Sequence, residues 1–201
     1  MSRIFLFFIV IFLTNCTTRS NPWDEVTIDQ DISGDSIYRQ LDKQVEIFDA
    51  LEEHDSLMRR TSDVAYLSGF RINQGIDEYF KDYNCRAYFL DSDTLSINIG
   101  IGNGFGGNGF IISYKDKKFY TEPYFSTDVI IVGEAKPIYK IVYQKLTLDK
   151  PNYKLGDSLY GKIEFKSIET DKYFRKTEYF GKGNFRTKVK RLGTWTAPNA
   201  S

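Results

Sequence analysis

Hydrophobic residues recur every three or four positions in the N-terminal part of the chain. Between Asp35 and Arg60 the apolar positions with this spacing are Tyr38, Leu41, Val45, Phe48 and Leu51. The spacing predicts one amphipathic α-helix, capped by Asp35 or Ser36. A second, shorter helix is predicted over residues 73–83, where the shared apolar face consists of Ile76, Tyr79, Phe80 and Tyr83.

From Cys85 onward the hydrophobic period changes to two, which is typical of strands with one buried face. In residues 94–101 the apolar members of the alternation are Leu95, Ile97, Ile99 and Ile101. Further strands are predicted at 110–120, 128–133, 138–148, 158–168 and 184–192, with turn-forming segments such as 180–183 between them. The 16 Phe and 14 Tyr residues suit half-buried strands.

Together these patterns predict an α+β fold that is mostly antiparallel β. We expect a β-sandwich or barrel-like sheet with one or two N-terminal helices packed on it. A single globular domain is expected over residues 35–195, with helices within 35–83 and an antiparallel sheet within 85–192. The stretch YKLGDSLYGKIEF, residues 153–165, resembles the turn-strand pattern of extracytoplasmic immunoglobulin-like sandwiches.

The first residues have the pattern of an export signal. Arg3 is followed by ten uninterrupted apolar residues, Ile4 to Leu13, which is about half the length needed to span a bilayer as a helix. The run ends in LTNC, residues 13–16, and with this motif the segment resembles a bacterial lipoprotein signal peptide. An ordinary secretory signal is the alternative, and both interpretations export the chain.

The lipoprotein resemblance implies a signal peptide over residues 1–15 and a lipid on Cys16. The polar segment 16–34 is then expected to be a flexible tether. Acylated Cys16 would hold the protein on a lipid bilayer in the cell envelope, and because Thr17 is not Asp, the resemblance favours the outer membrane. Cys85 would be the only other thiol, so the fold is expected to have no internal disulfide.

Six glycines lie between Ile99 and Phe110, and they match G-x-G-x-x-G in two overlapping registers. A dinucleotide site needs a helix after such a loop, whereas a strand is predicted here. The kinase motifs that would accompany a glycine loop between strands are absent from the sequence. We therefore expect a hairpin tip with no bound nucleotide, in which Phe105 is a candidate partner-binding residue.

The sequence offers little material for catalysis. His54 is the only histidine, Cys85 opens a predicted strand, and no G-x-S-x-G motif is present. Asp91 and Asp93 are typical of a turn. The chain contains too few Cys and His residues to form a zinc site. No cofactor, metal or catalytic residue is predicted, although a pair of carboxylates distant in sequence would escape this reasoning.

The chain has 27 acidic and 27 basic residues, but they are unevenly distributed along the sequence. Residues 17–100 contain 17 acidic and 8 basic residues, whereas residues 101–201 contain 10 acidic and 18 basic residues. Near the C-terminus, Arg186, Lys188 and Lys190 occupy every second position and should share one strand face, with Phe185 and Val189 on the other. These three are candidate partner-binding residues for an anionic lipid or an envelope protein. The strand does not match an RNA-binding motif, and nucleic acid is not expected as a partner.

The favoured function is therefore a membrane-anchored, non-catalytic binding module of the cell envelope. Two alternatives remain open. One is an envelope hydrolase that acts on glycan or peptidoglycan through paired carboxylates, and the other is an inhibitor or immunity-type lipoprotein.

Overall fold

The computed structural model describes residues 22–50, 58–69, 81–90, 93–128 and 137–192 of the chain. It is mostly β, and ten strands form one mixed sheet that is not closed. The described helices are a 3-10 turn, η1 (Ile32–Gly34), and the short α1 (Ser36–Leu41). The strands are β1 (Asp24–Glu25), β2 (Thr27–Ile28), β3 (Ala65–Ser68), β4 (Asn84–Phe89), β5 (Leu95–Gly102), β6 (Gly106–Lys115), β7 (Lys118–Thr127), β8 (Ile138–Leu148), β9 (Ser158–Thr170) and β10 (Lys176–Arg191).

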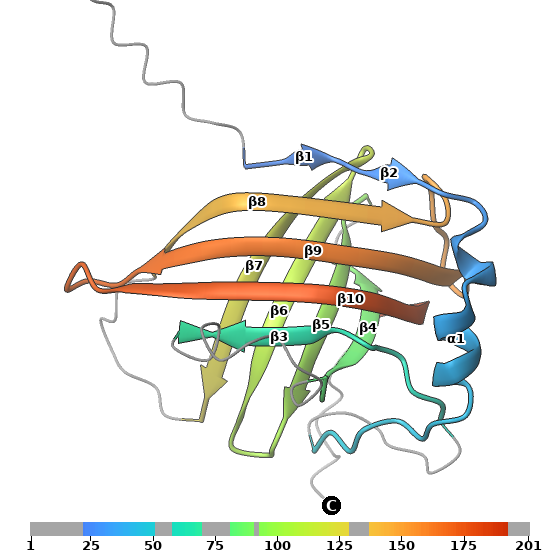
Figure 1. The fold of residues 1–201 in the computed structure, drawn as a ribbon, viewed down its shortest axis with the longest axis horizontal. Helices are drawn as coiled ribbons and strands as arrows, with labels where there is room; N and C mark the ends of the chain where they lie inside the picture. Colours follow the sequence, from blue (N-terminus) through green and yellow to red (C-terminus); the bar gives the residue numbers. More distant parts are fainter. Residues whose placement is uncertain (1–21, 51–57, 70–80, 91–92, 129–136, 193–201) are drawn as a thin grey trace, which may run out of the picture.

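The sheet folds into two layers that cross each other (Figure 1). Strands β4 to β7 make one layer, and β3, β10, β9 and β8 run across it in the other. The layers are joined where Val189–Arg191 of β10 pairs in parallel with Ala87–Phe89 of β4. The long ladders are antiparallel as expected. The sheet is mixed because the short β4–β10 and β2–β8 pairs are parallel.

The hydrophobic core lies between the two layers. Its centre includes Phe110 of β6 and Phe165 of β9, whose ring centroids are 4.7 Å apart. The long strands contribute alternate residues to this core, as the period of two predicts. The fully buried aliphatic side chains of this core include Leu95, Ile97, Ile99, Ile112, Leu146, Leu148, Leu159 and Ile163.

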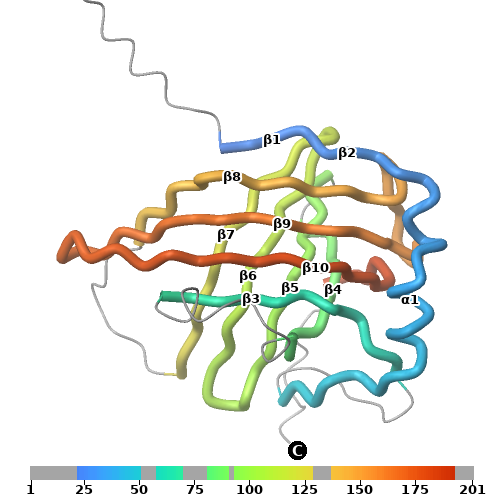
Figure 2. Tube along the Cα trace, viewed as in Figure 1, coloured from blue at the N-terminus to red at the C-terminus, as the bar shows by residue number. Residues whose placement is uncertain are grey.

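The N-terminal strands span the edge where β7 and β8 face each other (Figure 2). β1 pairs with β7, and two residues later β2 pairs with β8. Gln144 of β8 strengthens this edge, because its side chain accepts from Thr121 N and donates to the carbonyl of Pro22. The expectation of a flexible tether over 16–34 is therefore wrong from Asp24 onward, where the chain belongs to the domain.

The prediction of one long N-terminal helix is also wrong. α1 ends at Leu41, and residues 42–50 continue without helix, with a β-bridge between Val45 and Arg59. Backbone hydrogen bonds to other segments replace helical ones, since Glu46 N donates to Met58 O and Ala50 N donates to Gly102 O. Val45 and Phe48, expected on the buried face, are exposed.

The rest of the range 35–83 also differs from the predicted helices where the structure describes it. β3 is a strand inside the range 35–83, because it pairs with β10. Leu51 lies outside the described residues, and so do residues 73–80 of the second predicted helix. Among the described residues, no helix has the length and apolar character needed to cross a membrane.

The strand predictions for the C-terminal part are largely confirmed. β8 coincides with the predicted 138–148, and β9 begins at Ser158 as expected. The predicted turn at 180–183 is wrong, since these residues lie inside β10. A Cβ on Gly181 would lie 2.3 Å from Phe165 Cε1, so glycine here makes room for a core ring. Most of the strand predicted at 128–133 lies outside the described residues.

Candidate functional site

The three basic residues predicted on one strand face do share that face. Arg186, Lys188 and Lys190 alternate along β10 with Phe185 and Val189, which are buried in the core. The basic side chains line a hollow of about 540 Å³, which we call the basic groove. It is defined by five cationic residues, Arg59, Arg86, Arg186, Lys188 and Lys190, together with Glu46, Met58, Thr61, Ser158, Tyr160 and Thr187.

The cations of the basic groove differ in how far they are already paired. Arg186 Nη1 donates to Asp42 Oδ1 at 2.6 Å, and the same guanidinium donates to the carbonyl oxygen of Arg60. Arg186 therefore holds the segment after α1 in place. Within the described part of the chain, Arg59, Lys188 and Lys190 have no side-chain hydrogen bond or ion pair, so these three charges are available to a ligand.

A buried ion pair forms one wall of the basic groove. Arg86 Nη1 lies 2.5 Å from Glu46 Oε1, and Thr61 Oγ1 donates to the same oxygen at 3.2 Å. Glu46 is only 5% exposed, and its second carboxylate oxygen, Oε2, is buried without a hydrogen-bond partner in the structure. The groove thus combines unpaired cations with an unsatisfied carboxylate acceptor.

Phe105 lies at the tip of the β5–β6 hairpin, as predicted for the glycine-rich stretch. Gly104 has φ of 87°, a conformation that favours glycine, and Asn103 Oδ1 accepts a hydrogen bond from Phe105 N. The Phe105 ring is 73% exposed and shares a hollow of about 550 Å³ with Phe48 and Phe125, 67% and 77% exposed. We call this hollow the aromatic groove.

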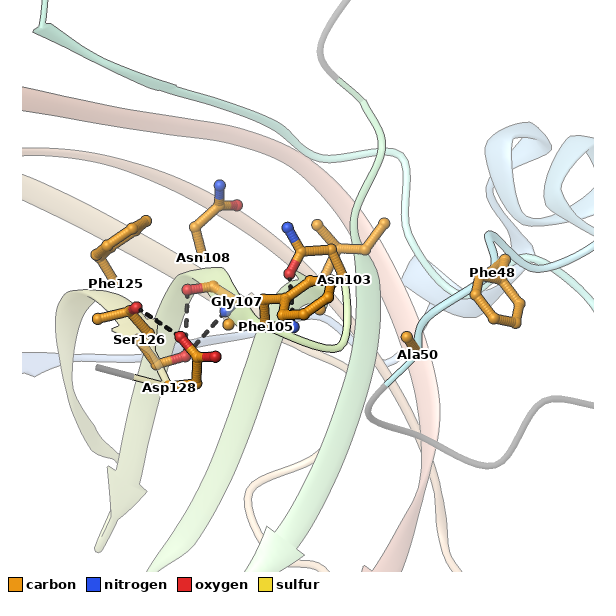
Figure 3. Close-up of a pocket in the computed structure, with 13 residues that line it drawn as sticks. Phe48, Ala50, Asn103, Phe105, Gly107, Asn108, Phe125, Ser126 and Asp128 are labelled. Atoms are coloured by element: carbon orange, nitrogen blue, oxygen red, sulfur yellow. Dashed lines mark hydrogen bonds between the residues drawn. The ribbon is translucent and has the colours of Figure 1, made fainter. Parts of the chain in front are cut away.

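Figure 3 shows how the aromatic groove is arranged. The three phenylalanine rings stand at separate points, with Asn103 beside Phe105, and Ser126 and Asp128 near Phe125. Ser126 Oγ accepts a hydrogen bond from Gly107 N. Glycines 102, 106 and 107 line the same hollow, so part of its wall is bare backbone. Aromatic faces therefore stand next to amide, hydroxyl and carboxylate groups.

A third, small hollow of about 80 Å³ lies on the outer face of the β4–β7 layer. We call it the polar hollow, because its lining includes Asp49, Asn84, Asn98 and Tyr124. The Tyr124 hydroxyl donates to Asn98 Oδ1 at 3.1 Å. Asn84 Nδ2 donates to the carbonyl of Ile47, whereas Asn84 Oδ1 is buried without a partner in the structure.

The residues considered for catalysis do not assemble into a reactive centre in the described part of the chain. Cys85 is fully buried in β4, where burial raises the pKa of its thiol. Asp93 forms an exposed ion pair with Lys115, whose hydrogen bond lowers the pKa of the Asp93 carboxyl. His54 and Asp91 lie outside the described residues. No cluster of three metal-ligating side chains occurs among the residues that the structure describes.

No family model, curated protein sequence or solved structure matches this chain. Sequence reasoning missed Glu46 and Arg59, as well as Phe48 and Phe125. Arg86 was detectable in principle, because it alternates in β4 with the buried Cys85 and Ala87 and so belongs to the outer face.

Proposed function

We propose that this protein is a lipid-anchored protein of the bacterial cell envelope whose β-rich domain binds an anionic ligand without catalysing a reaction. The observation that carries the proposal is the basic groove. Lys188 and Lys190 of β10 stand in it with Arg59, and none of the three has a side-chain ion pair with another described residue.

Electrostatics explain why such a groove selects an anion. Cations held close together on a rigid strand repel one another, and an anionic group placed between them replaces this repulsion with attraction. Charge-assisted hydrogen bonds to carboxylate, sulfate or phosphate oxygens are about twice as strong as neutral ones. Ser158 and Tyr160 line the same groove, and their side chains carry hydroxyl groups that are able to donate to the remaining ligand oxygens.

The membrane anchor in this proposal is acylated Cys16. The domain begins with β1 at Asp24, eight residues later, and a chain segment of that length spans at most about 28 Å. A lipid on Cys16 would therefore keep the domain close to the bilayer surface. The basic groove would then meet ligands of the envelope, and the outer membrane is the location we favour.

The test uses the purified lipidated protein in a non-ionic detergent, with fluorescent dextran sulfate and uncharged dextran as probes. We expect tight, salt-sensitive binding of dextran sulfate only. In Lys188→Gln/Lys190→Gln the affinity should fall by roughly tenfold or more, since each lost contact is worth about 1 kcal/mol. The matched control is Lys145→Gln/Lys162→Gln, which removes two exposed strand lysines outside the groove and should bind like the wild type.

The same protein is then mixed with vesicles of phosphatidylglycerol or phosphatidylcholine. Groove-dependent binding to phosphatidylglycerol vesicles would assign the anion to the lipid surface, and binding to dextran sulfate alone would assign it to a soluble or polymeric anion. Equal affinity for charged and uncharged dextran, or loss of affinity to the same degree in both double variants, would contradict the proposed function.

A further inference from the structure

The three hollows described above adjoin one another, because neighbouring hollows share lining residues. Arg86 lines both the basic groove and the polar hollow. Gly102 and Gly107 line both the polar hollow and the aromatic groove. The hollows therefore form a row, which we call the track, from β10 past Arg86 of β4 and Gly102 of β5 to the β5–β6 hairpin.

The chemistry of this track changes along its length. Unpaired lysines stand at the β10 end, amide and hydroxyl groups lie in the middle, and exposed phenylalanine rings stand at the hairpin end. A ligand that occupies the whole track must be extended, and it must present an anion, polar groups and apolar faces in that order.

Two buried acceptors on the track have no hydrogen-bond donor among the described residues. Glu46 Oε2 belongs to a side chain that is 5% exposed, and Asn84 Oδ1 to one that is 2% exposed. A buried acceptor without a donor destabilises the ligand-free protein, so a donor supplied by a ligand is favoured there. Simple anions such as phosphate diester or carboxylate groups carry no donor for these oxygens, whereas a ligand rich in hydroxyl groups does.

We propose that the track is a binding site for an acidic oligosaccharide, an inference that rests on the proposed function. Sugar rings offer C–H faces to the Phe105 and Phe125 rings, and hydroxyl donors to Asn84 and Glu46. A carboxylate, sulfate or phosphate on the sugar reaches Lys188 and Lys190. A single lipid headgroup would fill only the basic groove, and an acidic peptide is the competing occupant that the test separates.

The test is calorimetric titration of the lipidated protein in non-ionic detergent. The probes are a heparin-derived hexasaccharide, the corresponding disaccharide, neutral maltohexaose and a hexaglutamate peptide. We expect the hexasaccharide to bind about tenfold more tightly than the disaccharide, because only the longer ligand contacts both the lysines and the phenylalanines. Maltohexaose should bind weakly, through the aromatic groove alone.

The aromatic end is tested with Phe105→Ser/Phe125→Ser, which changes exposed rings and should leave the unfolding midpoint unchanged. This variant should bind the hexasaccharide no better than the disaccharide. The matched control is Phe174→Ser, a change of an exposed ring in the β9–β10 turn, and it should behave like the wild type.

Two results would overturn the inference and leave the proposed function intact. One is a tenfold preference for the hexasaccharide that persists in Phe105→Ser/Phe125→Ser. The other is hexaglutamate binding as tightly as the hexasaccharide, which would make the occupant an acidic peptide. Failure of the wild type to bind any of the anionic probes, dextran sulfate included, would contradict both proposals.

Discussion

Arg86 of β4 and Glu46 of the segment that follows α1 form a buried ion pair, with Nη1 and Oε1 2.5 Å apart. The pair fixes residues 44–50 against the edge of the β4–β7 layer, together with the backbone bond from Ala50 N to Gly102 O. It also stands between the basic groove and the polar hollow, so the same contact shapes the fold and the candidate site.

Removal of one partner of this ion pair should strongly destabilise the protein. Glu46→Gln leaves the Arg86 guanidinium buried without a countercharge, and we expect a loss of about 3 kcal/mol in the free energy of unfolding. Glu46→Met/Arg86→Met removes both charges and should recover more than half of that loss. Urea unfolding monitored by circular dichroism measures both values, and a single-variant loss below about 1 kcal/mol would contradict burial of the pair.

Gly181 is predicted to be intolerant of even one methyl group. A Cβ there would lie 2.3 Å from Phe165 Cε1, and displacement of a core ring should cost about 1–3 kcal/mol. Gly34→Ala is the matched control, since a Cβ at Gly34 meets no atom within 4 Å. Thermal or urea unfolding of the two variants tests the contrast, and equal stabilities would show that the ring has room to move.

The buried tyrosines should respond differently to loss of their hydroxyl groups. The Tyr153 hydroxyl donates to Asp149 Oδ1 at 2.6 Å, so Tyr153→Phe should cost about 1–3 kcal/mol. The Tyr66 hydroxyl is buried without a hydrogen-bond partner in the structure, and Tyr66→Phe should therefore be neutral or stabilising. Comparison of the two urea midpoints tests this, and a larger loss for Tyr66→Phe would indicate a partner for its hydroxyl.

Most of the sheet could be predicted from sequence because its strands bury alternate residues. β9 illustrates this, because buried residues alternate regularly from Leu159 to Ser167 and turn-forming residues precede the strand. The predicted strand 110–120 is divided into β6 and β7 by a two-residue turn at Asp116 and Lys117, both with positive φ. In these strands the local hydrophobic pattern and the pairing with neighbouring strands favour the same structure.

The errors arose where contacts with distant segments decide the local structure. Val45 and Phe48 fit a helical stripe, yet the backbone of residues 44–50 bonds to Met58 and Gly102, and Glu46 pairs with Arg86. The glycines of 180–183 suggested a turn, whereas Gly181 makes room for Phe165. In the same way, Lys188 and Lys190 were predicted from alternation alone, whereas Arg59, which lines the basic groove and bridges to Val45, belongs to no predicted strand.

Lipidation at Cys16 remains a prediction from the signal-like N-terminus. Metabolic labelling of the producing bacterium with a clickable palmitate analogue should mark the wild-type protein and leave Cys16→Ser unlabelled. Cys85→Ser is the control for the other thiol, and because Cys85 is buried in β4, that variant should keep its label. Equal labelling of the wild type and Cys16→Ser would exclude the anchor.

Chemical footprinting of the lysines tests the central claim, that the basic groove binds an anion. The purified lipidated protein is treated with a trace of formaldehyde and cyanoborohydride, with and without saturating dextran sulfate, and the methylation rate of each lysine is measured by mass spectrometry. The account predicts slower methylation of Lys188 and Lys190 in the presence of dextran sulfate, with Lys145 and Lys162 unchanged. Protection of Lys145 and Lys162 to the same degree, or no protection of Lys188 and Lys190 at saturation, would contradict it.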